Sequence, residues 1–335
     1  MHPSLQTSNV ADLPTSCRKY ASNAAAGSAK DLNMLFLLMD ADKIPATKLS
    51  LLLPVFYQNL DVRGCPTLDS VDVQGPNFIS PIVRALGSMK GLFMLREKNQ
   101  ITSEVGEALW PRLWTWIQAL DLYRDVVKQI VEVSWPEYMT YNLFVAMFYL
   151  ARPNPGAVLL ADIPSLRAIL ARAWMFFVQA DALNEPGFNT VAMFFFSDAA
   201  PARSDHLSEY IDGAGGTIDA FAGLVMDYFA LSFPSRHSGR MALSSANYHF
   251  SIGLIRLLIE GEEADDPLST VLLNRGFIRQ LTALTCLYGH DAQNDWEEGL
   301  LQLCLSLLNN KLTAFAGYQA VGDALCQRLN RAAPH

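Results

Sequence analysis

Apolar residues recur at intervals of three and four along almost the whole chain, a spacing that gathers them on one face of an α-helix. Three stretches show it most clearly, at residues 166–177, 243–258 and 296–308. Strict alternation of apolar and polar residues, which would indicate a β-strand, is nearly absent, and Val71-Asp72-Val73 is its best example. The pattern therefore predicts an all-α protein with little or no sheet.

Residues that favour the ends of helices flank two of these stretches. Asp162 and Pro164 precede the first, where an N-cap and a first-turn proline belong. Asn294 or Asp295 can cap the start of the third, and a polar run at 309–311 follows it. We expect both helices to begin and end near these residues.

Short segments rich in Gly, Pro, Asp, Asn or Ser divide the chain into helices and helix pairs. They lie at 62–77, 152–156, 184–189, 201–205, 234–239 and 261–267. None is long and polar enough to resemble an interdomain linker. We predict a poorly structured or short-helix N-terminus at 1–30. A single helical-repeat domain at 31–332 follows, made of stacked antiparallel helix pairs in an armadillo or HEAT-like α-solenoid.

Composition and charge narrow the class of protein. Of the 335 residues, 51% are apolar and 17% charged, which is ample for a large buried core. The net charge of -8 opposes binding to nucleic acid or to anionic lipid. No apolar stretch approaches the roughly 20 residues that span a bilayer, and the N-terminus lacks the features of a secretory signal. We expect no membrane or nucleic-acid partner and a cytoplasmic or nuclear location.

The cysteines indicate neither disulfides nor zinc. There are five, Cys17, Cys65, Cys286, Cys304 and Cys326, and they are widely scattered with no Cys-x-x-Cys pair. An odd, dispersed set of this kind is typical of buried free thiols. We expect no metal ion and no cofactor.

The most distinctive segment is 108–123, Ala-Leu-Trp-Pro-Arg-Leu-Trp-Thr-Trp-Ile-Gln-Ala-Leu-Asp-Leu-Tyr. It contains three tryptophans within seven positions. Helical spacing places several of its apolar residues on one wide face, namely Trp110, Leu113, Trp114, Ile117 and Leu120, with Trp116 and Tyr123 beside them. Such a face indicates a core helix with Pro111 at a kink or at its start, and the alternative is a peptide-binding groove lined by the rings.

This segment resembles the Leu-Trp-Pro-x-Leu-Trp-x-Trp-Ile-x-x-Leu-Asp-x-Tyr stretch in the helical region of a family of mushroom-forming fungal proteins, many of which carry a MYND-type zinc finger. The resemblance is clear over 101–123 and extends more weakly over most of the chain. The matching residues are Trp110, Pro111, Leu113, Trp114, Trp116, Ile117, Leu120, Asp121 and Tyr123. It implies a helical-repeat region which, in that family, is joined to a finger that recruits partner proteins.

The finger itself does not carry over. Tetrahedral zinc must be enclosed by four close thiolate or imidazole groups, which a MYND finger supplies from Cys-x-x-Cys pairs and further Cys and His ligands. No Cys-x-x-Cys pair occurs in this sequence. We expect a finger-less or shortened member of the family.

An enzyme is an alternative to this interpretation, because class I terpene cyclases are acidic, all-α proteins of similar length. Their two carboxylate clusters hold magnesium against a diphosphate. Here Asp265-Asp266 is followed at once by Pro267, and Asn294-Asp295 lacks the serine and the final acid of the second motif. No catalytic, cofactor-binding or metal-ligating residue is therefore predicted.

The sequence favours a non-enzymatic protein-interaction scaffold with an unknown protein partner. The alternative is a small-molecule binder or enzyme with a pocket enclosed by helices, as in a terpene-cyclase-like fold, because the apolar and aromatic content is high. A third possibility is a family remnant with a structural role only.

Overall fold

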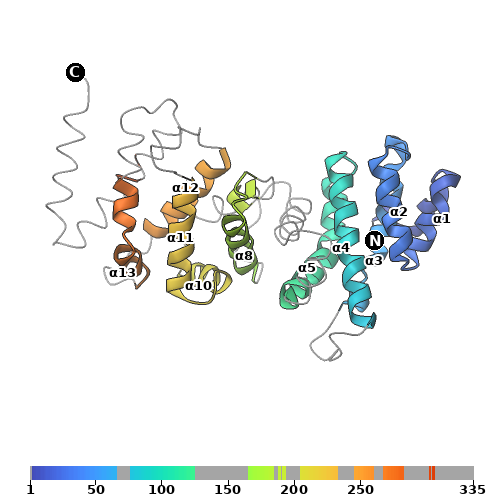
Figure 1. Cartoon of the computed structure of the whole chain (residues 1–335). Helices are drawn as coiled ribbons and strands as arrows, with labels where there is room; N and C mark the ends of the chain where they lie inside the picture. Colours follow the sequence, from blue (N-terminus) through green and yellow to red (C-terminus); the bar gives the residue numbers. More distant parts are fainter. Residues whose placement is uncertain are drawn as a thin grey trace, which may run out of the picture. The chain divides into compact units, whose positions relative to one another are not determined.

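The computed structural model describes residues 2–65, 76–124, 165–184, 188–189, 191–193, 204–232, 245–259, 267–282, 302 and 304–305. Every regular element in these ranges is an α-helix or a 3₁₀-helix, which confirms the predicted all-α class (Figure 1). The packing of the chain divides it into two compact units, residues 1–154 and 155–335.

The first unit begins with 3₁₀-helices and continues with α-helices. Its elements are η1 (Pro3–Leu5), η2 (Thr7–Asp12), α1 (Thr15–Ala25), α2 (Ala29–Asp40), η3 (Ala46–Leu52), α3 (Leu53–Asn59), η4 (Val62–Gly64), α4 (Pro76–Glu97) and α5 (Ser103–Leu122). The boundary expected between residues 30 and 31 falls inside α2, on which α1 packs. The single helical-repeat domain expected at 31–332 stays a prediction.

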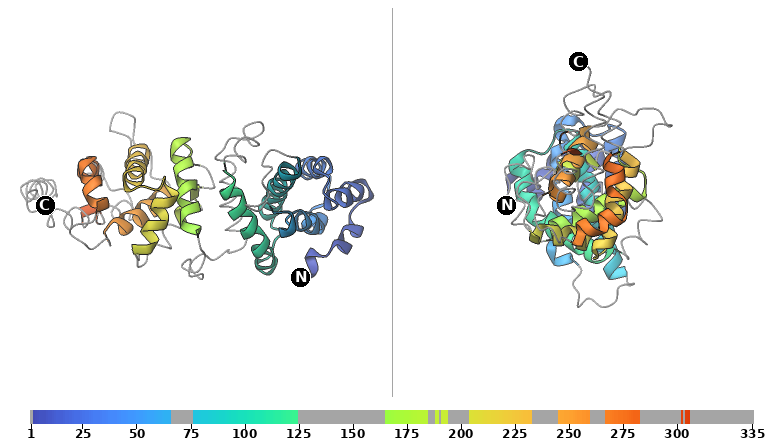
Figure 2. Two further views of the ribbon diagram at one scale, coloured as in Figure 1. Left: turned by 90° about the horizontal axis from the view of Figure 1, so that it is seen from below. Right: turned by 90° about the vertical axis from the view of Figure 1, so that its left-hand side faces the viewer.

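Four helices form the body of the first unit. α1 packs on α2 and α3, and α4 packs on the same two helices (Figures 1 and 2). The close approach of α4 to α3 depends on Gly91, because a Cβ at this position would overlap the ring of Phe56. The interior is mainly aliphatic, and its fully buried residues include Leu35, Met39, Val55, Ala85, Met89 and Leu92.

Three helices of this unit end in the same way. Gly27, Asp42 and Asn99 follow α1, α2 and α4 and adopt left-handed backbone angles, with φ of 100°, 49° and 54°. In each case the next backbone amide donates to the carbonyl five residues earlier, at 2.8 to 3.0 Å. This closure satisfies carbonyls that a helix end leaves without an intrahelical donor, and Gly, Asn and Asp tolerate the left-handed angles best.

Long-range cationic caps reinforce the ends of α1, α2 and α3. Each cap is a hydrogen bond from a cation to a carbonyl 55 to 59 residues earlier, the pairs being Arg84 Nη1 to Gly27 O (3.4 Å), Lys98 Nζ to Met39 O (3.5 Å) and Arg112 Nη1 to Tyr57 O (2.8 Å). A positive charge is favourable at the negative end of a helix dipole. α4, α5 and their connection therefore fasten the carboxyl ends of the three earlier helices.

The second unit contains α8 (Leu166–Gln179), α10 (Ser204–Gly213), α11 (Ile218–Ser232), α12 (Ser245–Ile259) and α13 (Pro267–Asn274) among its described residues. α8 and α12 confirm the helices predicted at 166–177 and 243–258. The N-cap of α8 is Ser165, in a left-handed conformation with φ of 62°, and not Asp162. Most of the helix predicted at 296–308 lies outside the described residues.

Small residues and the ion pair of a buried arginine join α10 to α8. A Cβ at Gly213 would overlap the backbone carbonyl of Ala168, so the two helices approach closely only because this residue is glycine. Arg167 is 1% exposed, and its Nη1 lies 3.5 Å from Oε1 of Glu209. A buried guanidinium needs such a partner, because leaving its charge uncompensated would be costly.

The interior of the second unit is organised around the ring of Trp174, which has no exposed surface. Its centroid lies 5.9 Å from that of Phe221, 6.0 Å from Tyr228 and 4.9 Å from Phe250. The Tyr228 hydroxyl lies 3.0 Å from the carbonyl of Asn247, to which it donates, and 2.9 Å from Oγ of Ser251. This cluster joins α8, α11 and α12.

Candidate functional site

The tryptophan-rich segment forms α5. Thr102 caps its start, with Oγ1 accepting from the amide of Val105 at 3.4 Å. Pro111 lies within the helix and not at its start, so the carbonyl four residues earlier receives no bond from a backbone amide there. Thr115 Oγ1 donates to the carbonyl of Pro111 at 2.9 Å. The helix continues through the proline to Leu122.

The motif residues divide by burial into two groups. Leu113, Trp116, Ile117 and Leu120 are at most 1% exposed. Asp121 is also buried, whereas Trp110, Trp114 and Tyr123 are half-buried and Pro111 is exposed. The centre of the buried face thus lies at Trp116, whereas the helical pattern predicted Trp116 beside the apolar face. Trp110 and Trp114 lie at its margin.

Trp110 and Trp114 form a stacked pair. Their ring centroids are 5.5 Å apart and their planes are inclined by 14°. Residues four apart on a helix lie one above the other, so the stacking follows directly from the spacing. Each ring restrains the other, and together they present a preformed, half-buried aromatic surface.

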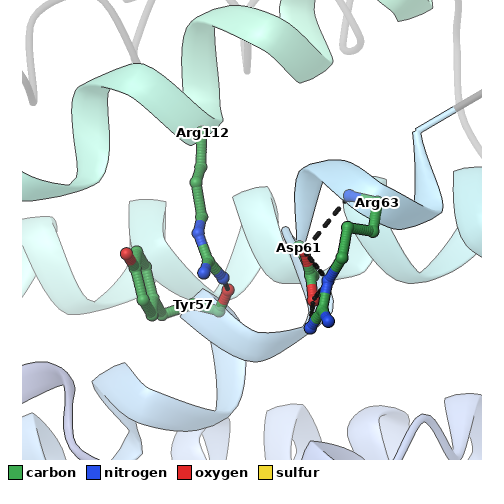
Figure 3. A network of polar contacts seen from close by, with 4 residues as sticks. All are labelled: Tyr57, Asp61, Arg63 and Arg112. Atoms are coloured by element: carbon green, nitrogen blue, oxygen red, sulfur yellow. Dashed lines mark hydrogen bonds and ion pairs between the residues drawn. The ribbon is translucent and has the colours of Figure 1, made fainter. Parts of the chain in front are cut away.

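Arg112 fixes α5 against the end of α3. Its guanidinium carbon lies 3.8 Å from the centroid of the Tyr57 ring, and Nη1 donates to the Tyr57 carbonyl (Figure 3). This cation–π contact adds to the capping of α3 described above. Cys65 supplies a weak second link, its Sγ lying 3.9 Å from the carbonyl of Thr115. The aromatic pair therefore stands on an anchored helix.

A surface ion pair lies beside this anchor. Arg63 donates to the Asp61 carboxylate through Nε and Nη2, and its backbone amide also donates to Oδ1 (Figure 3). The side chain of Arg63, followed by its amide, lowers the pKa of Asp61 to about 2, with a further contribution from the charge of Arg112. The carboxylate is ionised at neutral pH.

Sequence reasoning did not single out Tyr57 or Arg112 as parts of this region. Tyr57 lies 55 residues before Arg112, and no local pattern links positions so far apart. Arg112 lies inside the tryptophan segment, and its position opposite the Trp110–Trp114 stripe was the available signal. A cation on the second face of an apolar helix suggests a polar contact there.

The described thiols are poor nucleophiles. Burial raises the pKa of the Cys17 thiol. It also raises the pKa of Cys65 to about 11 and that of Cys304 to about 12. A thiol attacks as the thiolate, so these groups are almost wholly in the unreactive form at neutral pH. Among the described residues, no three His, Cys, Asp or Glu side chains gather in a way that could hold a metal ion.

Several sequence features lie outside the described residues, among them Asp265-Asp266, Asn294-Asp295 and Cys326. Within the ranges given above, no helix is both long and apolar enough to cross a membrane.

Comparison of the chain with protein families, with curated proteins and with solved structures finds no match. The resemblance to the MYND-type fungal family remains a prediction from the motif at 108–123.

Proposed function

We propose that this chain is a non-enzymatic protein-interaction scaffold and that the stacked Trp110–Trp114 pair on α5 is a contact site for its protein partner. In this proposal the packed helix pairs continue as an armadillo or HEAT-like stack. The protein is then a finger-less relative of the MYND-type fungal proteins and acts in the cytoplasm or nucleus, without nucleic acid or membrane as partner.

The observation that carries the proposal is the half-buried aromatic pair on an anchored helix. Tryptophan is among the residues that contribute most to protein–protein affinity, because one ring buries a large area with little loss of side-chain freedom. Stacking at 5.5 Å between centroids already restricts both rings. Arg112 restricts the helix that carries them through its contact with Tyr57. Preorganisation of this kind lowers the entropic cost of binding.

The test compares three forms of the full chain: wild type, the double variant Trp110→Ala/Trp114→Ala, and Gln118→Ala as control. Gln118 is exposed on the same helix, so its replacement disturbs the same surface without removing a ring. Each form is immobilised and exposed to an extract of the native host, and bound proteins are quantified by mass spectrometry. Circular dichroism establishes that the double variant keeps its helix content.

We expect at least one protein to bind wild type and Gln118→Ala alike and to bind the double variant about 30-fold more weakly, as loss of a binding hot spot of about 2 kcal/mol requires. Identical binding profiles for a folded double variant and for wild type would contradict the proposal.

A further inference from the structure

The outer side of α5 carries acidic residues next to the tryptophan pair. Glu104, Glu107 and Pro111 are exposed, and half-buried Trp114 follows them at the same intervals of three and four residues. Such intervals place side chains on one side of a helix, so these positions form a continuous stripe along α5. Trp110 lies beside the stripe and stacks on Trp114. The aromatic pair thus has two carboxylates on its amino-terminal side.

The charge of this stripe is not neutralised within the part of the chain that the structure describes. There, the Glu107 side chain makes no hydrogen bond or ion pair. Glu104 is 84% exposed, and its described ion pair is a distant one, with His2 Nε2 at 3.9 Å. Arg112, the one basic residue of α5, lies against the Tyr57 ring and not on the stripe (Figure 3). The stripe is therefore negative and favours a positive ligand.

Pro111 adds a main-chain acceptor at the same place. Proline has no amide hydrogen, so it cannot donate to the carbonyl of Glu107, four residues earlier in the helix. Helix carbonyls that lack such a donor take hydrogen bonds from side chains, water or ligands. Glu107 therefore offers two kinds of acceptor, a carboxylate and a main-chain oxygen, one helical turn before Trp110.

Aromatic rings beside acceptor oxygens are complementary to a flat cation. The face of an indole ring is negative and attracts a positive group. A guanidinium is planar, stacks on such rings and directs several N–H donors toward neighbouring oxygens, whereas an ammonium is compact and more strongly hydrated. A purely apolar ligand would instead remove water from the Glu107 carboxylate without replacing its hydrogen bonds, which is costly. Among protein side chains, arginine fits these requirements best.

We propose that the partner protein binds this site through an arginine side chain. Its guanidinium stacks on the Trp110–Trp114 pair and donates to the carboxylate and the main-chain carbonyl of Glu107, and Glu104 adds to the attraction. The inference rests on the function proposed above for the tryptophan pair, and it names the chemistry of the partner segment that the pair takes.

The experiment uses the full chain and two short polyalanine peptides. One peptide has a central arginine, and the other has citrulline there, which keeps the length and the planar end but has no charge. NMR follows the indole N–H signals during titration at constant ionic strength, and Trp110→Phe and Trp114→Phe assign the two signals of the pair. Glu107→Gln removes the proposed acceptor charge. Asp40→Asn removes the same charge from an exposed residue at the end of α2 and is the matched control.

The arginine peptide should shift the signals of Trp110 and Trp114 and bind wild type about fivefold more tightly than the citrulline peptide. The charge adds a cation–π attraction and strengthens the hydrogen bonds to Glu107. Glu107→Gln should lose most of this preference, and Asp40→Asn should keep it. Added salt should weaken binding of the arginine peptide more than that of the citrulline peptide, because salt screens exposed charges.

Equal affinity of wild type for the two peptides would overturn the inference. So would a preference that Glu107→Gln keeps in full, or an arginine peptide that shifts neither signal of the pair. These failures are distinct from failure of the proposed function. If the double variant Trp110→Ala/Trp114→Ala loses a partner from the extract while wild type shows no preference for arginine, the pair is a contact site of another chemistry. If the double variant loses no partner, the proposed function itself is wrong.

Discussion

The two units of this chain solve the same packing problem by different means. In the first unit the interior is largely aliphatic, and cations from the α4–α5 region bind carbonyls at the ends of α1, α2 and α3. In the second, three aromatic rings from α11 and α12 surround Trp174 of α8. The described contacts of the first unit are therefore spread over several helix ends, whereas those among α8, α11 and α12 converge on one side chain.

The two units also differ in net charge. The first unit, residues 1–154, has fourteen basic and fourteen acidic residues, and the second, residues 155–335, has eleven basic and nineteen acidic ones. The whole net charge of -8 belongs to the second unit. The excess negative charge that opposes nucleic-acid binding therefore lies in the second unit alone. The first unit has no net charge, and three of its cations, Arg84, Lys98 and Arg112, cap its own helices.

The largest expected effect comes from removing the centre of the aromatic cluster. Trp174→Ala should destabilise the second unit by about 3 to 5 kcal/mol, because the lost ring leaves a cavity among Phe221, Tyr228 and Phe250. Hydrogen exchange with mass spectrometry, reading peptides of α8 and α11 against peptides of α1 and α3, measures the loss. Trp174→Phe, which keeps a ring, should cost clearly less. Equal loss of protection in both units would show that Trp174 does not stabilise the second unit in particular.

Replacing a helical glycine by alanine should change the free energy of unfolding in opposite directions in the two units. Gly91→Ala forces a Cβ into the ring of Phe56, and overpacking of this kind costs about 1 to 3 kcal/mol. At Gly223 in α11 the nearest atoms to an added Cβ belong to the Arg275 guanidinium, with Nη1 at an ordinary contact distance of 3.5 Å. There alanine should stabilise the helix by about 0.5 to 1 kcal/mol. Urea unfolding of the two variants compares them, and a gain for Gly91→Ala would show that the α3–α4 contact has room.

Loss of a cationic cap should cost less than overpacking. Arg112→Met keeps an unbranched side chain but removes the hydrogen bond to the Tyr57 carbonyl and the contact with the Tyr57 ring. We expect a loss of about 1 to 2 kcal/mol in the free energy of unfolding. Arg112→Lys keeps the charge without the planar donor fork, so its stability should lie between that of wild type and that of Arg112→Met. An unchanged midpoint for Arg112→Met would mean that α5 needs no such anchor.

Helical periodicity was enough to predict the class and two of the helices. The apolar stripes at 166–177 and 243–258 became α8 and α12, because a long stripe outweighs uncertainty at any single position. The predicted N-cap of α8, Asp162, was wrong. Asp162, Pro164 and Ser165 are all acceptable near a helix start, and only tertiary packing selects one of them. Periodicity fixes the face of a helix better than it fixes its ends.

The N-terminal segment and the tryptophan helix show where sequence reasoning stopped. Leu5, Val10 and Leu13 lie among polar residues at a spacing with no helical repeat, so their burial gave no periodic signal. In α5 the stripes through Trp110 and Trp116 are neighbours, and hydrophobicity alone could not decide which of them faces the core. The contact of Arg112 with Tyr57 depends on the fold and cannot be read from either local sequence.

The smallest effect is electrostatic and concerns single carboxylates of the first unit. Asp61 has its pKa lowered from 3.8 to about 2, chiefly by hydrogen bonds from the side chain and amide of Arg63. A depressed pKa stabilises the folded state above the unfolded value, so this contribution is complete above pH 3.8 and is lost as the pH falls toward 2. An NMR titration of the side-chain carboxyl carbons should give a midpoint near 2 for Asp61. Arg63→Gln should return it toward 3.8.

Asp42 supplies the matched control for this titration. Its pKa is also lowered, by a hydrogen bond from Lys98 and by the charge of that residue. Arg63→Gln should therefore leave the Asp42 titration unchanged, and Lys98→Gln should raise the pKa of Asp42 without moving that of Asp61. If either substitution moved both carboxylates equally, the shifts would reflect the general field of the unit. Separate responses would show that each pair acts locally, as expected for exposed charges that salt screens beyond about 10 Å.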